Sequence, residues 1–359
     1  MYDIDFFKNT DNLKNKITKG FLKNSDCDNI DVELETLRKK FPYIYNIETT
    51  NYCNMKCVMC PRTMFMTRKN IWIDDQLFEK IISNVKTHDQ KSVENFWHWV
   101  ENDYDQKVNE VSENGFYFSV ISRHLVLHGF GEPFLDKKLI PRIELCTKKK
   151  IPTYFSCTPA TMTVEKGEKA MEAGLGVLKF SLDAMDERKI KEIRGKKADF
   201  ADSIEKILKL LETKKKKNFK TLLVPCMIDL AVGPNDVDMH KKFLEFWSDK
   251  DVFAYIKSQD NRYMYENDKD LKSKSHYSKQ YCEYPWLSVS IMADGNVVPC
   301  TQISNHELVL GNINKNTLEE IWNGKKYQEL RRMHISGKFP KGHKCNEKCD
   351  MKKIYQYLS

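Results

Sequence analysis

The sequence predicts an α/β protein with a parallel sheet whose strands alternate with helices along residues 43–260. Short β-rich runs recur along this stretch, and each run except the last is followed by a helix-like segment. Strands that alternate with helices form parallel βα units with right-handed crossovers. We therefore expect a sheet that is open or curled into a partial barrel, with ligands at the carboxyl ends of its strands.

Six strands are expected in this stretch. They are residues 43–50 (YIYNIETT), 124–130 (HLVLHGF), 151–157 (IPTYFSC), 176–183 (GVLKFSLD), 220–229 (KTLLVPCMID) and 251–257 (DVFAYIK). Apolar residues recur at helical spacing after Asp75 and again between Ile204 and Leu211, which predicts helices there. Gly174 stands where a glycine would end the helix before it.

Three segments interrupt the alternation of strands and helices. Residues 1–42 are expected to form a polar, helical preface, and residues 261–281 a linker before a C-terminal domain at 282–359. Residues 88–123 are long for a link between a helix and the next strand, and they are too aromatic for a disordered linker. We expect this insertion to be helical and to pack on the outside of the barrel, in preference to forming an active-site lid.

The composition limits the class of protein. Of the 359 residues, 41% are hydrophobic and 31% charged, which suits a globular chain with a buried core. No run approaches the ~20 apolar residues of a membrane span, and the polar N-terminal segment is no signal peptide. We expect a cytoplasmic protein with no membrane partner, whose eleven cysteines bind metal or act in catalysis. The net charge of +8 suits an acidic electron carrier better than nucleic acid as a partner.

Three cysteines follow the first strand directly: Cys53, Cys57 and Cys60. On a loop at the end of a strand they can face one point and ligate three irons of a 4Fe–4S cluster, which leaves the fourth iron open to a small molecule. This CxxxCxxC spacing resembles that of the radical S-adenosylmethionine (SAM) superfamily, although Met59 stands where that family often has an aromatic residue. The resemblance implies that the open iron binds the amino and carboxylate groups of SAM. A structural zinc site is the alternative, and it lacks a fourth ligand nearby.

Two further motifs extend the resemblance. Residues 129–133 (GFGEP) follow the second strand and resemble the family's Gly-Gly-Glu motif, which implies that Gly131 and Glu132 contact the SAM ammonium. Ser181 and Arg194, at and beyond the end of the fourth strand, resemble the family's SAM-binding serine and arginine. A helix cap at Ser181 or Asp183 and a surface position for Arg194 are the alternative interpretations. No adenine motif is recognisable on the fifth strand.

The C-terminal domain holds a second set of cysteines: Cys282, Cys300, Cys345 and Cys349. Gly295 is placed as the turn of a hairpin between LSVSIM and VVPC. Four thiolates satisfy a 4Fe–4S cluster and leave no open iron. The run YCEYPWLSVSIMADGNVVPC, followed by LGNINKNTLEEIWNGKKYQELRR, resembles the SPASM/Twitch auxiliary-cluster domain, and four cysteines imply the shorter, single-cluster Twitch form. Zinc on the same four thiolates is the alternative.

The resemblance covers about Tyr45 to Met351 and implies a partial (β/α)6 TIM-like barrel with a small Twitch/SPASM-like domain. It implies an enzyme that reductively cleaves SAM to a 5′-deoxyadenosyl radical, which abstracts hydrogen from a substrate, with a flavodoxin or ferredoxin-type protein as electron donor. We expect a polar small molecule, such as a sugar or cyclitol derivative, to be oxidised or modified with help of the auxiliary 4Fe–4S cluster. Peptide modification is the alternative, and a non-catalytic metal-binding RNA protein would need the open cluster to be accidental.

Further candidates for substrate or proton handling lie near strand ends. They are Cys157, Cys226, Asp229, Gln259 and Asp260. Buried packing is the favoured role of the two cysteines in that group. His128 and Cys146 are expected to be core residues.

Overall fold

A single nine-stranded sheet organises the part of the chain that the computed structural model describes, namely residues 1–13, 26–108, 110–230, 235–259, 282–347, 349 and 357–358 (side chains of 235–237 and 347 excepted). Its strand order is β6-β5-β4-β3-β2-β1-β7-β8-β9. The first six strands are mutually parallel neighbours: β1 (Tyr43–Ile47), β2 (Leu125–Val126), β3 (Thr153–Cys157), β4 (Val177–Ser181), β5 (Leu222–Asp229) and β6 (Tyr255–Ser258). All six strands that the sequence predicts are thus confirmed.

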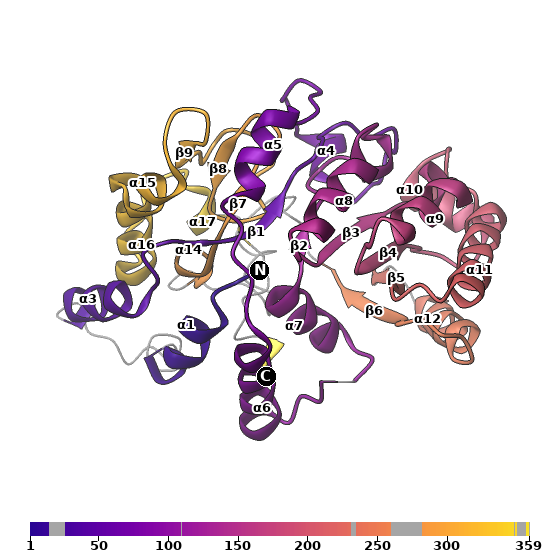
Figure 1. The fold of residues 1–359 in the computed structure, drawn as a ribbon, viewed down its shortest axis with the longest axis horizontal. Coiled ribbons are helices and arrows are strands. Elements are labelled where there is room, and N and C mark those ends of the chain that lie inside the picture. The colour runs from indigo at the N-terminus through magenta and orange to yellow at the C-terminus, as the bar shows by residue number, and fades with distance from the viewer. Residues whose placement is uncertain are drawn as a thin grey trace.

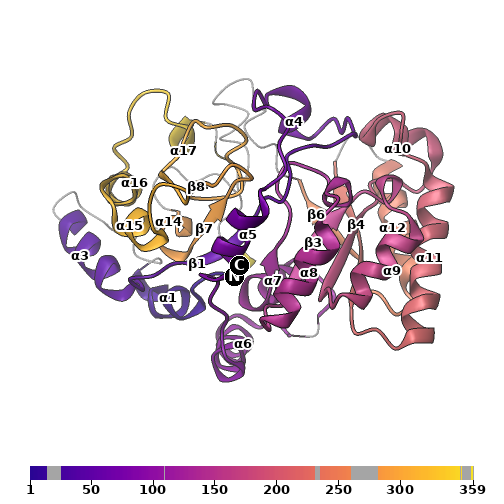
Figure 2. The same ribbon diagram turned by 45° about the horizontal axis from the view of Figure 1, so that its top comes forward.

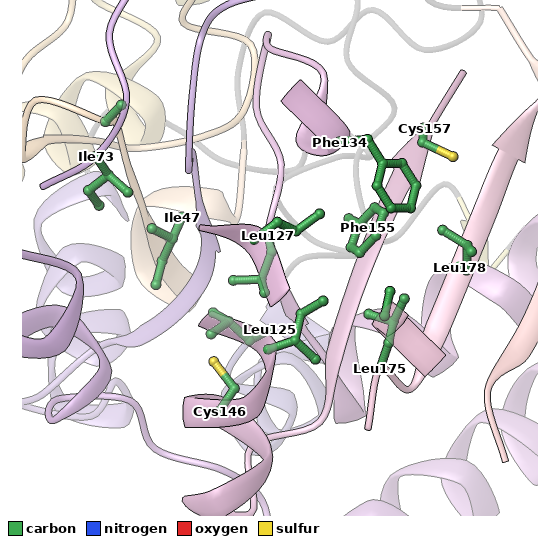
Figure 3. Packing of buried hydrophobic residues seen from close by; sticks show 14 of the residues in the cluster. Ile47, Ile73, Leu125, Leu127, Phe134, Cys146, Phe155, Cys157, Leu175 and Leu178 are labelled. Atoms are coloured by element: carbon green, nitrogen blue, oxygen red, sulfur yellow. The ribbon is translucent and has the colours of Figure 1, made fainter. Parts of the chain in front are cut away.

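Helices pack against the outer face of these six strands, as Figure 1 shows. They are α5 (Asp75–Ile82), α8 (Leu139–Lys148), α9 (Val164–Glu172), α10 (Glu187–Arg194), α11 (Phe200–Lys217) and α12 (Asn235–Trp247). Every second strand residue points toward them, so that Leu125, Phe155 and Leu178 lie in one buried cluster with Cys146 of α8 (Figure 3). The expected core position of Cys146 is confirmed. The strands curve into a partial (β/α)6 barrel, as the sequence predicts.

Local sequence explains where these helices begin and end. Asp74 caps α5 by accepting hydrogen bonds from the N–H groups of Gln76 and Leu77, and the apolar side of α5 is buried. Gly174, just past α9, has a φ of +94°, a conformation that a glycine adopts without steric cost. The predicted role of Gly174 is therefore confirmed.

The insertion at residues 88–123 forms two helices, α6 (Gln90–Tyr104) and α7 (Glu113–Arg123), which pack on different parts of the molecule. Helix α6 packs on α1 (Ile4–Asn9) and on Phe118 of α7 in an aromatic cluster. Helix α7 instead packs Phe116 and Val120 on strand residues that face away from the outer helices: Val126, Tyr154, Val177, Val224 and Tyr255. The expectation that the whole insertion lies outside the barrel is wrong for α7, because the concave face of the sheet is itself apolar and α7 covers it.

The C-terminal segment continues the barrel sheet beyond β1. Strand β7 (Ser288–Ile291) pairs in parallel with β1, β8 (Asn296–Val298) pairs antiparallel with β7, and β9 (Gly311–Asn312) follows β8. Gly295, with a φ of +82°, lies in the β7–β8 turn, so the predicted hairpin is confirmed. Short helices surround these strands: α14 (Tyr284–Leu287), α15 (Leu318–Asn323), α16 (Lys325–Ser336) and α17 (Lys344–Glu347). Figure 2 shows them on one side of β1, with the barrel on the other.

The N-terminal residues join both halves of the molecule. The backbone N–H of Tyr2 donates to Ile121 O of α7 at 2.9 Å, and that of Asp3 donates to Leu287 O of α14 at 3.0 Å. Helix α1 then packs on α6 and α14, and α3 (Cys27–Leu37) packs on α16. None of the helices in the described ranges has both the length and the apolar character needed to cross a membrane.

Candidate active site and metal centres

The loop between β1 and the short helix α4 (Pro61–Met64) carries Cys53, Cys57 and Cys60. The N–H of Val58 donates to Ile193 O at 2.9 Å, and Arg194 Nη1 donates to Cys57 Sγ at 3.5 Å, so the loop is fixed to the end of α10. The Cys57 thiol lies close enough to the thiols of Cys53 and Cys60 to interact electrostatically with both. Burial raises the pKa of Cys53 to about 12, and burial also raises the pKa of Cys57. The thiols of Cys53 and Cys57 therefore stay neutral until a metal displaces their protons.

The donor set of this loop fits a 4Fe–4S cluster with one open iron, since three thiols are offered and a closed cluster takes four. In the described ranges, no three His, Cys, Asp or Glu side chains form a preformed metal cage. The glycines around the loop let the chain come close to it. A Cβ on Gly131 would lie 2.1 Å from Thr50 O, so the loop after β2 meets the loop after β1 only because residue 131 has no side chain.

Glu132 lies directly beside the cysteine loop. Its N–H donates to Tyr52 O at 2.9 Å, one residue before Cys53. Its buried carboxylate accepts from the N–H of Thr158 at 3.0 Å and from that of Phe134 at 3.4 Å. Burial raises the pKa of Glu132 to about 7, against the opposing effect of these two N–H groups. An ammonium group placed here would stabilise the ionised carboxylate.

Arg194 is buried and bridges two groups, so its interpretation as a surface arginine is wrong. Its guanidinium contacts Cys57 Sγ on one side and forms an ion pair with the fully buried Asp183 on the other. Asp183 Oδ1 also accepts from the N–H of Ile228 at 2.9 Å, which ties the ends of β4 and β5 together. Ser181 Oγ lies 3.1 Å from Ser156 Oγ, whereas the N-cap of α10 is Asp186. The structure thus gathers Ser181, Arg194 and the cysteine loop at the carboxyl ends of the strands.

Two charged residues of this region were missed by sequence reasoning. Glu48, directly after β1, and Arg68 form a buried bidentate ion pair with N–O distances of 2.7 and 2.8 Å. The Glu48 carboxylate also accepts from the N–H groups of Phe130 and Ala293, both at 3.2 Å. Glu48 could have been found from the sequence, because it is an acidic residue near the end of the first predicted strand. Arg68 lies on a loop without periodicity, and no sequence pattern indicates its role.

A cavity of about 190 Å³, here called the barrel cavity, lies on the concave side of the sheet. Its wall combines barrel strands, helix α7 and the residues after β8. Polar wall residues include Asn46, Glu48, Glu113, His128, Lys179, Lys257, Ser258, Gln259, Ser290, Cys300 and Gln302, and the aromatic ones include Phe116, Phe130, Tyr154 and Tyr255. Cys300, a predicted ligand of the auxiliary centre, therefore faces the same space as the barrel.

The other sequence candidates are distributed unequally around this cavity. Gln259 and His128 line it. His128 is half-buried at the wall, and its Nδ1 accepts from the N–H of Ser156 at 3.3 Å. The expectation that His128 is enclosed in the core is therefore wrong. Cys157 is buried in the outer core and Cys226 in the cluster under α7, and neither is among the wall residues. Asp229 lies 3.7 Å from His240 Nε2, away from the wall. Asp260 lies outside the described residues.

The four C-terminal cysteines lie in different packing environments. Cys282 and Cys349 are buried, whereas Cys300 and Cys345 are partly buried. Cys282 and Cys300 contact the aromatic cluster that includes α1, α6 and α14, and Cys345 contacts the main core. All eleven cysteines of the chain lie in the described ranges, and none forms a disulfide. Four thiols without a disulfide fit the donor chemistry of a closed iron–sulfur cluster.

Two protein-family models match the chain. The model of the radical SAM superfamily matches residues 47–246, and the model of the SPASM iron–sulfur cluster-binding domain matches residues 282–350. No curated protein matches the sequence at a significant level.

Solved structures with a similar fold share little sequence with the chain. Streptococcus suis SuiB bound to precursor peptide SuiA is 12% identical with a TM-score of 0.52, over 84% of this chain and 69% of SuiB. Native anSMEcpe with bound AdoMet and Cp18Cys peptide is 15% identical with a TM-score of 0.50, over 88% of this chain and 95% of the other. BtrN in complex with AdoMet and 2-DOIA is 15% identical with a TM-score of 0.45, over 82% and 88% of the two chains. At these identities the likeness is one of fold.

Proposed function

The chain belongs to the radical SAM superfamily and carries a SPASM domain, and on that premise we propose that it abstracts hydrogen from a polar small molecule bound in the barrel cavity. The bound cluster and SAM supply the 5′-deoxyadenosyl radical for this abstraction. The chain's own residues have three tasks: to hold SAM, to position the substrate carbon, and to exclude water and stray hydrogen donors.

For SAM, we assign the amino group to Glu132, since its carboxylate is buried beside the cysteine loop. Ser181 lies at the same strand edge and is assigned to the ribose or carboxylate of SAM. Arg194 is assigned to the carboxylate as well. Because Arg194 is already paired with Asp183, its guanidinium is held in place before SAM binds and orientation costs little on binding.

The position of the barrel cavity carries the proposal. Its wall is shared by the concave face of the barrel, by Phe130 of the predicted SAM-binding turn, and by Cys300 of the SPASM domain. A substrate in this space would lie between the two predicted metal centres. An auxiliary cluster at Cys300 would supply an electron acceptor beside a substrate that is oxidised.

The size and lining of the cavity support a small, polar substrate. A volume of about 190 Å³ lies below the ~300 Å³ at which pockets for drug-sized ligands begin. Amide, hydroxyl and charged groups alternate with aromatic rings on its wall, which suits recognition of several polar groups at fixed positions. Phe116 and Tyr255, whose ring centroids are 5.1 Å apart, close the side under α7 and limit the entry of water.

We also propose that a flavodoxin or ferredoxin-type protein delivers the electron at a surface beside the cysteine loop, here called the loop patch. Val58, Met64, Phe65 and Trp72 make up the loop patch, and each of them is between 45% and 62% exposed. Half of the exposed large hydrophobic residues in the described ranges are in this patch. Residues 54–72 contain Lys56, Arg62 and Lys69 besides the buried Arg68, and no Asp or Glu, which suits an acidic partner.

Deuterium transfer tests the proposed function. Reconstituted enzyme, reductant and SAM are incubated with fractionated extracts from cells grown in deuterated medium, one of small molecules and one of peptides. We expect deuterium in 5′-deoxyadenosine from the small-molecule fraction, and none with the Cys57→Ala variant. Transfer from the peptide fraction alone would replace the proposal with peptide modification.

A further inference from the structure

Two lysines line the barrel cavity. Lys179 is the third residue of β4, and Lys257 lies on β6. On β4, Leu178 and Phe180 point into the outer core, so Lys179 points into the concave side together with Val177 and Ser181. Lys179 precedes Ser181 by two residues, about 7 Å deeper along the strand.

The two carboxylates of the cavity wall accept hydrogen bonds from residues other than Lys179. Glu48 is neutralised by Arg68 through two hydrogen bonds. Glu113 accepts from the N–H of Ser258 at 3.0 Å and from its hydroxyl at 2.8 Å. Lys257 Nζ donates to Ser258 O at 2.9 Å.

The direct contacts of Lys179 Nζ are with neutral groups. Its Nζ donates to Tyr255 Oη at 3.5 Å and lies 5.7 and 5.9 Å from the ring centroids of Phe116 and Tyr255. No ion pair between described residues includes Lys179. A half-buried ammonium without a carboxylate costs free energy, and a bound anion would remove that cost.

We propose that the substrate enters the barrel cavity with an anionic group, a carboxylate or a phosphate, that is bound by Lys179. This inference rests on the proposed function, because it names the chemistry of the molecule that the same cavity holds. It places the anionic end deep in the barrel and the reacting carbon toward the cysteine loop. Neutral sugars and cyclitols would then be weaker ligands than their acidic derivatives.

Binding of matched ligand pairs tests this inference without turnover. Glucose 6-phosphate is compared with glucose, and gluconate with glucitol, by calorimetry on the fully reconstituted enzyme with SAM bound. We expect the anionic member of at least one pair to bind ten- to a hundred-fold more tightly, as one or two charge-assisted hydrogen bonds allow. The pair that shows the preference distinguishes phosphate from carboxylate. We expect Lys179→Met to abolish the preference and Lys179→Arg to retain most of it, with Lys220→Met as an exposed control.

Several outcomes overturn the inference. Equal affinity within both pairs, or no measurable binding of any of the four compounds, would show that the cavity does not select anions. A preference that survives in Lys179→Met would place the anion elsewhere. Loss of SAM affinity in Lys179→Met would assign this lysine to SAM. Deuterium transfer from a neutral small molecule would support the proposed function and contradict this inference. A preference for anions without deuterium transfer from any small molecule would support this inference and contradict the proposed function.

Discussion

Arg68 and Glu48 form a bidentate ion pair that joins three parts of the molecule. Arg68 Nη1 lies 2.7 Å from Glu48 Oε2 and Nη2 lies 2.8 Å from Oε1, and both side chains are at least 96% buried. Glu48 extends β1 and accepts from the N–H groups of Phe130 and Ala293, and Arg68 Nε donates to Ser304 O at 2.8 Å. The pair therefore connects the predicted SAM-binding turn to the SPASM domain.

Removal of one member of this pair is expected to destabilise the protein strongly. Arg68→Met would leave a buried, uncompensated carboxylate, at a cost of about 3–5 kcal/mol in the free energy of unfolding. Adding Glu48→Gln to that variant should recover part of the loss, because the unpaired charge is gone. Chemical denaturation measures both. Lys169→Met, which breaks the exposed Lys169–Glu165 pair, is the control, and it should change stability little because solvent screens an exposed pair. An Arg68→Met variant as stable as the control would contradict this account.

Metal analysis is expected to find two clusters. Anaerobically reconstituted protein should hold about eight irons and about eight sulfides per chain, and about half of each after Cys53, Cys57 and Cys60 are all changed to Ala. Iron and sulfide assays with elemental analysis measure this. Stoichiometric zinc together with the iron of only one cluster would assign the C-terminal cysteines to zinc.

The affinity for SAM is expected to depend on pH through Glu132. Burial raises the pKa of Glu132 to about 7, so its carboxyl is largely protonated at pH 6 and ionised at pH 8. Since the ionised form attracts the SAM ammonium, affinity should rise with pH up to about tenfold per unit below pH 7. The amino group of SAM itself titrates near pH 8 and also changes the affinity with pH. The Glu132→Gln variant measures this contribution of SAM alone, because its residue 132 does not titrate. A ratio of wild-type to variant affinity that is constant from pH 5.5 to 7.5 would rule out Glu132 as the SAM ligand.

The Glu132 carboxyl is also expected to make the stability of the folded protein depend on pH. A carboxyl whose pKa is raised in the folded state contributes stability that is fully present below its unfolded pKa of 4.5 and is lost as pH rises through about 7. Metal-free wild-type protein should therefore lose stability between pH 5 and pH 8, on the order of 3 kcal/mol. Denaturation of Glu132→Gln at both pH values should show a smaller loss.

The two metal centres are expected to have separable roles. Cys345→Ala should retain dithionite-driven formation of 5′-deoxyadenosine but lose most turnover of the true substrate, whereas Cys57→Ala should lose both. If the second centre is structural, Cys345→Ala should misfold, because a small metal domain has little core without its metal. Circular dichroism and size-exclusion chromatography distinguish these cases. Normal turnover by a folded Cys345→Ala protein without its second cluster would refute an electron-transfer role.

The loop patch is expected to govern reduction by a protein donor. Replacing Met64 and Phe65 by Glu places negative charge on an apolar, basic surface and should slow flavodoxin-driven SAM cleavage tenfold or more. Dithionite-driven cleavage should be unaffected, since a small reductant needs no docking surface. The exposed Leu244→Glu variant is the control. Equal slowing with both reductants would point to damage of the cysteine loop.

The barrel could be predicted from the sequence because its signals are local. Strand runs and helical periodicity recur in order, and Cys53, Cys57 and Cys60 lie within one loop. The position of α7 could not be predicted in this way. Phe116 and Val120 form an apolar stripe that would suit either face of a sheet, and only the arrangement of the strands decides which face needs cover.

The site was predictable where a motif is contiguous and not where distant residues meet. Glu132 and Arg194 were found by their position after strands, but the buried pairing of Arg194 with Asp183 depends on the turn between β4 and α10. The wall of the barrel cavity draws on segments from Tyr45 to Tyr357, and apart from those of Phe130 and Cys300 these segments have no sequence signature of their own. Lys179 looks like any lysine in a strand until its neighbours are known.

The pairing of β1 with β7 also bears on biosynthesis. Tyr43 aligns with Ser288, so the ribosome must add most of the chain before β1 gains its second neighbour. Until residues 288–291 emerge, β1 is an open strand edge, which can pair with another nascent chain. Contacts this distant along the chain also form slowly. Growth at low temperature and low expression rate is therefore expected to raise the yield of folded protein.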